Sequence, residues 1–471
     1  MVAINAYLKK AWHHKTARNA SWMLVGQGGN FLLQAGYFIL MARLLGVNEY
    51  GAFAGAFALV NIISPYSALG GGMLFMRYVI ADRSKAGLYW GNALLATSLI
   101  SLAIAMALFF VGPSITGVHS PLMFVALTIG NCLFAQISVM ASQVFQAYEK
   151  LKLTAAVSFS SNLARFLVLV VMFVTLHRAT AFQWSIGVLV ASGIAAILSL
   201  WWVRGDVGNS SYSWKVIRQR FGEGLGFSFA GTTQAVYTDI DKTMLTHYGL
   251  DRENGFYTLA YRIIDFASTP VIALDLAIVP KYFALTKYRF REVVKLAIKV
   301  SRTSVLMGVG IAICTLLVAP VVPRLVGKDF SGVLVALQWL CWIPLFRGVH
   351  RSMGSALTGT GFQHLRTGAQ FTVAAVNLIL NLWWIPKFGW IGAARSSFAC
   401  DGMLACMNTA LLLWVFRQTE HRKTNSMTDD GGKSGAPEQC ICGHRDISSA
   451  APGLEELCGD TATNPGIGRC G

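Results

Sequence analysis

Three basic side chains lie close together in one apolar stretch, where Arg347, His350 and Arg351 follow at intervals of three residues and one. In an α-helix this spacing places all three on one face. Two guanidinium groups about one turn apart can each hold phosphate oxygens in forked geometry. The pattern therefore predicts a site for a diphosphate or another anion, although side chains that reach toward lipid headgroups would have the same spacing.

Two further arginines, Arg165 and Arg262, also lie inside apolar stretches. An ionisable side chain at the centre of a bilayer costs about 2.5–3.5 kcal/mol on insertion scales, so each should face a cavity or a partner. Arg165 lies near the middle of its stretch, too far from either end to reach the membrane surface. These arginines indicate a polar lumen that suits an anionic substrate.

Amide side chains form a stripe near the N-terminus, where Gln27, Asn30 and Gln34 occupy positions i, i+3 and i+7 of a predicted helix. Such a stripe can line a wet, substrate-binding cavity. It can equally form hydrogen bonds that hold neighbouring helices together. The sequence leaves both interpretations open.

Carboxylates gather in two neighbouring stretches, Asp239 and Asp241 in one and Asp265 in the next, at depths similar to Arg262. They predict either a salt-bridge network that breaks and re-forms during opening or a static structural pair. The Asp-x-Asp spacing resembles a glycosyltransferase metal motif. Helix positions i and i+2 point about 200° apart, however, so we expect no metal site there.

The elements that must position these side chains are membrane helices. The 471 residues are 54% hydrophobic and 13% charged, with a mean hydropathy of +0.52, whereas soluble domains carry about 25% charged residues. Apolar windows about 20 residues long predict an all-α polytopic membrane protein, and no strand-like alternation favours a barrel. The twelve predicted spans are 19–42, 50–76, 88–111, 121–146, 153–176, 181–203, 223–246, 255–280, 297–322, 331–357, 367–386 and 390–416.

The basic residues serve as topology signals in this scheme. The net charge of +17 comes from short clusters between the apolar runs rather than from one basic face, so we expect no nucleic-acid partner. The clusters alternate between successive loops, which predicts an even number of spans with both termini cytoplasmic. The nine cysteines form neither a disulfide framework nor a zinc-site spacing.

An internal repeat divides the chain. The segment LLGVNEYGAF (44–53) matches HYGLDRENGFY (247–257), with Gly46 aligned to Gly249 and Gly51 to Gly255. Two halves with six spans each would then be related by an axis along the membrane normal. The predicted parts are a cytoplasmic leader (1–18), an N-terminal six-helix bundle (19–203), a basic cytoplasmic linker (204–222), a C-terminal six-helix bundle (223–416) and a disordered cytoplasmic tail (417–471).

Four motifs together make the chain resemble a known family. They are ARLLGVNEYG (42–51), DIDK (239–242), GFYTLAYRI (255–263) and WIPKFGWIGAARSS (384–397). Over residues 19–416 the sequence resembles the polysaccharide transporters (Wzx-type oligosaccharide flippases) of the multidrug/oligosaccharidyl-lipid/polysaccharide (MOP) exporter superfamily.

The resemblance implies alternating-access transport of a lipid-linked (polyprenyl-diphosphate) oligosaccharide across the bacterial inner membrane, for O-antigen of lipopolysaccharide or for exopolysaccharide. Coupling to a proton or sodium gradient would make Asp239, Asp241 and Asp265 candidate coupling residues. Polysaccharide polymerase and chain-length proteins are the implied partners. No ATPase motif is present, and we expect neither a cofactor nor enzymatic activity.

Three alternatives remain. A lipid II flippase of the same superfamily would also have a basic cavity. A drug/cation antiporter would need unpaired buried carboxylates, against which the membrane arginines argue. A membrane polymerase, ligase or glycosyltransferase would carry a large outer loop, and the predicted outer loops are short.

Overall fold

The regular elements of the described chain are all helical. The computed structural model describes the backbone of residues 15–286 and 290–430 and the side chains of residues 33–285 and 290–419. The first group of helices is α2 (Lys15–Ser67), α3 (Gly71–Val79), η1 (Arg83–Lys85), α4 (Ala86–Thr116), α5 (Pro121–Thr128), η2 (Ile129–Ala135), α6 (Gln136–Ala147), α7 (Leu151–Leu176) and α8 (Ala181–Val207).

The second group begins with α9 at Trp214, inside the predicted linker (204–222), because α8 extends to Val207 and leaves only residues 208–213 between the two helices. It consists of α9 (Trp214–His247), α10 (Asp251–Ala267), α11 (Thr269–Thr286), α12 (Phe290–Val318), η3 (Ala319–Val321), α13 (Val322–Val326), η4 (Lys328–Phe330), α14 (Gly332–Leu340), α15 (Ile343–Gly359), α16 (Gln363–Phe388) and α17 (Trp390–Asp430). Because α17 continues to Asp430, the first part of the predicted tail is helical. The remaining predicted tail (431–471) and most of the predicted leader (1–14) lie outside the described residues.

The helices confirm the predicted fold class, an all-α polytopic membrane protein. Eight described helices are long and apolar enough to cross a membrane, or up to ten if each of two bent pairs is one span. The bends measure 44° between α10 and α11, and 46° before α15. The sequence predicts twelve spans because it divides Leu33–Val79 into two and also includes α9, which is not among the counted helices.

Helix α2 is interrupted at Gly46, where the first two predicted spans meet. Gly46 has φ 70° and ψ 172°, which is not a helical conformation. Its counterpart in the repeat, Gly249 between α9 and α10, has φ +72°. Glycine enters this region readily because it has no Cβ. Both repeat segments therefore turn at an equivalent glycine.

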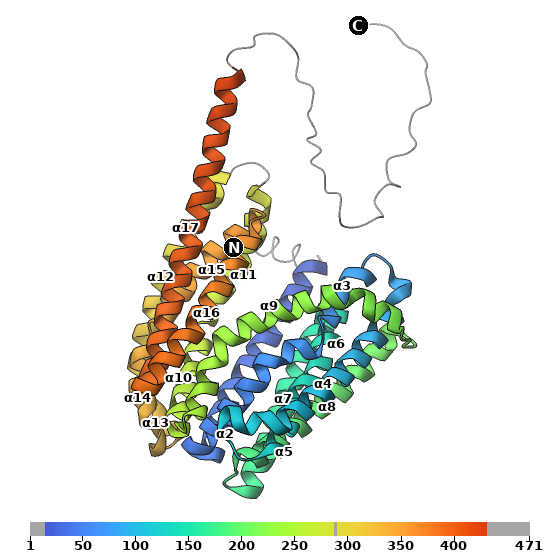
Figure 1. The fold of residues 1–471 in the computed structure, drawn as a ribbon, viewed down its shortest axis with the longest axis vertical. Helices are drawn as coiled ribbons and strands as arrows, with labels where there is room; N and C mark the ends of the chain where they lie inside the picture. The colour runs from blue at the N-terminus through green and yellow to red at the C-terminus, as the bar shows by residue number, and fades with distance from the viewer. Residues whose placement is uncertain (1–14, 287–289, 431–471) are drawn as a thin grey trace, which may run out of the picture. The chain divides into compact units, whose positions relative to one another are not determined.

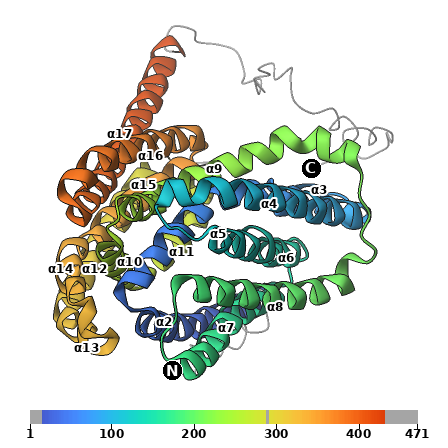
Figure 2. The same cartoon turned by 60° about the horizontal axis from the view of Figure 1, so that its bottom comes forward.

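Helices of each group pack mainly against one another. Figures 1 and 2 show α3 to α8 on one side of the molecule and α10 to α16 on the other. Helix α9 runs diagonally between them: it contacts α3 and α4 as well as α10 and α16 (Figure 1). Helix α2 packs against α7 and α8 of its own group and against α9 and α10. The two groups therefore meet along α2, α9 and α10.

That meeting is closest at the turns of the internal repeat. Asn254 is fully buried, and its side-chain amide donates to the carbonyl oxygen of Gly51 at 2.9 Å. The Thr246 hydroxyl donates to the same carbonyl at 3.3 Å. The sequence predicts that both turns lie on the outer side of the membrane. In this conformation the two groups are joined at that end.

Candidate functional site

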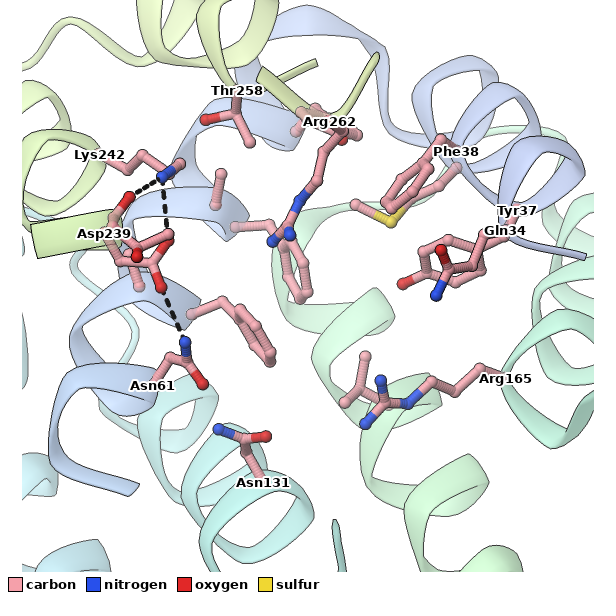
Figure 3. A pocket seen from close by; sticks show the side chains of 18 of the residues that line it. Gln34, Tyr37, Phe38, Asn61, Asn131, Arg165, Asp239, Lys242, Thr258 and Arg262 are labelled. Atoms are coloured by element: carbon pink, nitrogen blue, oxygen red, sulfur yellow. Dashed lines mark hydrogen bonds and ion pairs between the residues drawn. The ribbon is translucent and has the colours of Figure 1, made fainter. Parts of the chain in front are cut away.

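A cavity of about 390 Å³ lies between the two groups of helices and is lined by α2, η2, α7, α8, α9 and α10. We call it the central cavity (Figure 3). Its lining mixes aromatic rings with charged and amide side chains, as expected of a ligand site. The polar lining residues are Gln34, Asn61, Asn131, Asn162, Arg165, Thr238, Asp239, Lys242, Thr258 and Arg262.

Two arginines from opposite walls point into the central cavity. Arg165 comes from α7 and Arg262 from α10, and Figure 3 shows both guanidinium groups directed into the open space. Arg262 lies 5.8 Å from the ring centre of Phe38. Among the described side chains, neither arginine forms an ion pair or a hydrogen bond. Two guanidinium groups that project into one cavity without a direct ion-pair partner among the described side chains are suited to bind an anion.

A third cation of the cavity, Lys242, is neutralised. It is only 4% exposed, and its Nζ lies 2.9 Å from Oδ1 of Asp239 and 3.5 Å from Oδ1 of Asp241. Asn61 donates to the other oxygen of Asp239 at 2.7 Å, and Tyr257 donates to Asp241 at 2.6 Å. Each buried charge thus has the partners that burial requires.

A separate pocket of about 350 Å³, the C-terminal pocket, lies among α9, α10, α15, α16 and α17. Arg347 projects into it and forms a 2.5 Å ion pair with Asp265. Its Nε is 3.8 Å from the buried carboxylate of Asp401, which also accepts from Tyr237 and lies 3.5 Å from Nε2 of His350. Arg351 lines the same pocket with a buried Nε that has no hydrogen-bond partner among the described residues.

The predicted site residues therefore fall into two cavities. Arg165, Arg262, Gln34 and Asp239 line the central cavity, and Arg347, Arg351 and Asp265 line the C-terminal pocket. Thr238 of α9 lines both. The backbones of Gln27 and Asn30 belong to α2, but their side chains lie outside the described ones.

The carboxylate pairing differs from the predicted network. The sequence groups Asp239 and Asp241 with Arg262, yet both bind Lys242, and Asp265 binds Arg347. The reason is local: Lys242 is three residues from Asp239 on the same helix, within reach of its side chain.

Several site residues were not predicted from the sequence. Asp401 received no role, although it lies at the centre of the Arg347 network. Asn61, Asn131 and Asn162 line the central cavity and were not singled out for it. These residues could have been found by the criterion that identified the arginines, namely a polar side chain within an apolar span.

Metal-binding geometry is not found in the described part of the chain, where no three His, Cys, Asp or Glu side chains are grouped to hold an ion. Asp239 and Asp241 are instead engaged by Lys242 and Tyr257. The CICGH segment of the tail (440–444) lies outside the described residues.

The fold around the central cavity is that of several solved membrane transporters. It is similar to the lipid II flippase MurJ in an inward closed conformation (TM-score 0.68, 14% identity, covering 84% of this chain and 87% of that one). It is equally similar to a multidrug resistance MATE family transporter in an inward-facing conformation (TM-score 0.68, 13% identity, 84% and 95%). A MOP superfamily transporter from Pyrococcus furiosus gives a TM-score of 0.55 at 14% identity, covering 84% and 95%.

The family is narrower than the superfamily. The model of the polysaccharide biosynthesis protein family matches residues 16–285, more than half of the chain, and the protein belongs to this family. No curated protein sequence matches the chain. The resemblance inferred from the four motifs is thereby confirmed.

Proposed function

We propose that the protein is a flippase that moves a polyprenyl-diphosphate-linked oligosaccharide across the bacterial inner membrane, to supply surface polysaccharide such as O-antigen or exopolysaccharide. Membership of the polysaccharide biosynthesis family supports the pathway class. The substrate's headgroup would enter the central cavity, and its lipid chain would stay in the bilayer.

The observation that carries the proposal is the pair Arg165 and Arg262. Both guanidinium groups project into one membrane-embedded cavity, and neither has an ion-pair partner among the described side chains. A diphosphate presents several oxygens that two guanidinium groups can bind from opposite sides. Gln34, Asn61 and Asn131 add amide groups around the same space.

Arg347 fits this role less well than Arg165 or Arg262 in the present conformation. Its guanidinium is already paired with Asp265 and lies near Asp401. Arg351 and Arg366 in the C-terminal pocket keep a basic surface there. We assign the diphosphate to the central cavity and propose that Arg347 and Arg351 contact the substrate only after the Asp265 pair opens.

A drug/cation antiporter is the main alternative, since MATE transporters have the same fold. A cation site needs an uncompensated carboxylate. Asp239 is the one acidic residue among the described residues that line the central cavity, and Lys242 neutralises it. The lining therefore has net positive charge, which favours an anionic substrate. A lipid II flippase shares this requirement and must be distinguished by experiment.

Alternating access would be performed by the two six-helix bundles, 19–203 and 223–416, joined by the basic linker. With both termini cytoplasmic, the repeat turns at Gly46 and Gly249 face outward, and the present conformation is closed on that side. Polymerase and chain-length proteins would receive the product at the outer face.

Ion coupling is assigned to Asp239, with Asp241 and Asp265 as supporting carboxylates. Protonation of Asp239 would remove the nearer of the two carboxylates that pair with Lys242 and leave Asp241 at 3.5 Å, so the net positive charge beside Arg165 and Arg262 would rise. Anion binding and proton binding would then favour each other. Sodium could replace the proton only by displacing Nζ of Lys242 from both aspartates.

The test is deletion of the gene in its host, followed by measurement of lipid-linked oligosaccharide and of the membrane face that holds it. Accumulation on the cytoplasmic face, with loss of surface polysaccharide and rescue by the intact gene, is the expected result. Lipid II accumulating on that face would identify a lipid II flippase. Unchanged lipids with increased sensitivity to cationic drugs would favour the antiporter, and accumulation on the outer face would favour a polymerase or ligase.

A further inference from the structure

A second polar hollow lies within the first group of helices, between α6 and α7, with contributions from α3 and α8. Its volume is about 520 Å³, and we call it the α6–α7 groove. Ser142 and Gln146 line it from α6, and Ser158, Ser161, Asn162 and Arg165 from α7. The three serines and Gln146 have no role in the diphosphate site described above.

The spacing of these residues gives each helix one polar face. On α7 they occupy positions i, i+3, i+4 and i+7, and on α6 they are four residues apart. Polar side chains are rare in membrane helices and are normally turned away from lipid. Two facing polar stripes with a hollow between them indicate space for a polar ligand rather than direct helix packing.

The hydroxyl groups are oriented as acceptors. Ser158 donates its proton to the carbonyl of Thr154 at 3.2 Å, and Ser161 donates to the carbonyl of Val157 at 2.9 Å. With their protons used inside the helix, both oxygens keep lone pairs for donors in the groove. Sugar hydroxyl groups are such donors. The amide of Gln146 offers both a donor and an acceptor.

The groove adjoins the central cavity. Asn162 and Arg165 line both hollows, so a ligand bound by Arg165 in one lies beside the other. In a polyprenyl-diphosphate oligosaccharide the first sugar is bonded directly to the diphosphate. A diphosphate held between Arg165 and Arg262 would place that sugar at the mouth of the groove.

Charge narrows the ligand class. Arg165 is the one charged residue among the described residues that line the groove. A cationic ligand would find no carboxylate there, whereas a neutral or acidic sugar would find hydroxyl, amide and guanidinium groups. We propose that the α6–α7 groove binds the sugars nearest the diphosphate and so selects the oligosaccharide; this inference rests on the flippase function proposed above.

The experiment compares two lipids on the purified full-length protein in detergent, by native mass spectrometry. One is the host's lipid-linked oligosaccharide, extracted from the deletion strain, and the other is the bare polyprenyl diphosphate. The test variant is Ser158→Ala with Ser161→Ala. The matched control is Ser160→Ala, on the same helix, whose hydroxyl also donates to the Val157 carbonyl at 3.0 Å but which does not line the groove.

Loss of two hydrogen bonds should weaken binding of the glycosylated lipid roughly five- to 150-fold. Binding of the bare lipid should not change, which also shows that the variant is folded. The Ser160→Ala control should bind both lipids as the wild type does.

Two other outcomes separate the proposals. If the double variant binds both lipids like the wild type, the groove does not hold the sugar, and the flippase function is unaffected. If the wild-type protein binds neither lipid, the proposed function itself fails. Equal weakening of both lipids by the double variant would also overturn the groove assignment, because the serines would then act on the diphosphate site.

Discussion

Gly51 of α2 lies directly against the backbone of Asp251 at the start of α10. A Cβ atom on Gly51 would be 1.8 Å from the carbonyl oxygen of Asp251, far inside van der Waals contact. The obstacle is backbone, so no side-chain rotation could relieve it. The two helices approach this closely only because residue 51 has no side chain.

The relationship is reciprocal. Gly255, the repeat counterpart of Gly51, would place a Cβ 2.0 Å from the carbonyl oxygen of Val47. Val47 precedes Gly51 by four residues, and Asp251 precedes Gly255 by four. In each half, therefore, a glycine lies directly against a backbone carbonyl group of the other half. This is a symmetric joint between the two groups of helices, at the end that the sequence predicts to lie outside.

Gly51→Ala is expected to prevent this end from closing. Overpacking of a tight contact costs about 1–3 kcal/mol, which would lower the ratio of closed to open molecules roughly five- to 150-fold. The measurement is labelling of an Ala58→Cys reporter, which lines the central cavity, by a membrane-impermeant maleimide added from outside. The background has the nine native cysteines replaced. Labelling should rise and transport should fall.

Gly310→Ala provides the matched control, because Gly310 lies in α12 and a Cβ added there would have no neighbouring atom within 4 Å. It should change neither labelling nor transport. Wild-type labelling and transport in Gly51→Ala would show that the joint does not control access.

Arg165→Ala and Arg262→Ala are each expected to weaken binding of a polyprenyl diphosphate. Loss of one hydrogen-bonded charge is worth about 1.5–3 kcal/mol, which corresponds to roughly a ten- to 150-fold loss of affinity. Lysine at either position should restore part of the affinity because the charge returns without the forked geometry. The affinities can be measured by native mass spectrometry of the purified variants.

The control for these variants is Arg395→Ala. Arg395 is exposed and stacks on Phe388 at 4.7 Å, and it lines neither the central cavity nor the C-terminal pocket. Removing its charge should leave diphosphate affinity unchanged. Equal losses in all three variants would indicate a general effect of net charge rather than a site.

Sequence alone predicts the fold class and most helix positions because the lipid bilayer strongly restricts which backbone structures can cross it. Backbone groups in a bilayer must be paired within helices, so apolar length identifies them. The glycines of the repeat predicted the turn at Gly46, and its positive φ follows from the residue type. The hydropathy of α9 was the weakest evidence for a span, since that helix carries Asp239, Asp241 and Lys242.

The site was predicted less completely because pairing depends on which helices meet. Sequence placed Arg347 and Arg165 in the membrane but could not show that only Arg347 has carboxylate partners. Asp401 is 136 residues from Asp265, and both reach Arg347 only through the packing of α10, α15 and α17. Ion-pair partners so far apart in the chain produce no local sequence pattern from which the pairing could be predicted.

Arg347→Ala is expected to lower stability as well as transport. The side chain of Asp401 is only 2% exposed, and removing a cation from such a buried carboxylate costs about 3–5 kcal/mol. The side chain of Asp265 is 37% exposed, so water compensates part of its charge. Asp401 would be left buried with only Tyr237 and His350 beside it. The thermal unfolding midpoint of the purified protein should fall clearly for Arg347→Ala. Arg351→Ala, which removes an unpaired arginine of the same pocket, should change the midpoint little.

The double variant Arg347→Ala with Asp265→Ala distinguishes lost pairing from lost packing. It should be more stable than Arg347→Ala, because one of the two orphaned carboxylates is gone. A midpoint equal to or below that of the single variant would mean that the ion pair contributes nothing specific.

Asp239→Asn is expected to uncouple transport from the proton gradient. The substitution removes the nearer of the two carboxylates that pair with Lys242, so the net positive charge of the cavity lining would stay raised at every pH. Substrate binding should then lose its dependence on pH, whereas wild-type binding should strengthen as the pH falls.

Asp241→Asn is the comparison, because Asp241 contacts the same lysine but does not line the cavity. We expect it to keep the pH dependence and to lower stability, since Tyr257 would lose its charged acceptor. Binding to purified protein at several pH values measures the first effect, and a wild-type pH profile in Asp239→Asn would rule out Asp239 as the coupling residue.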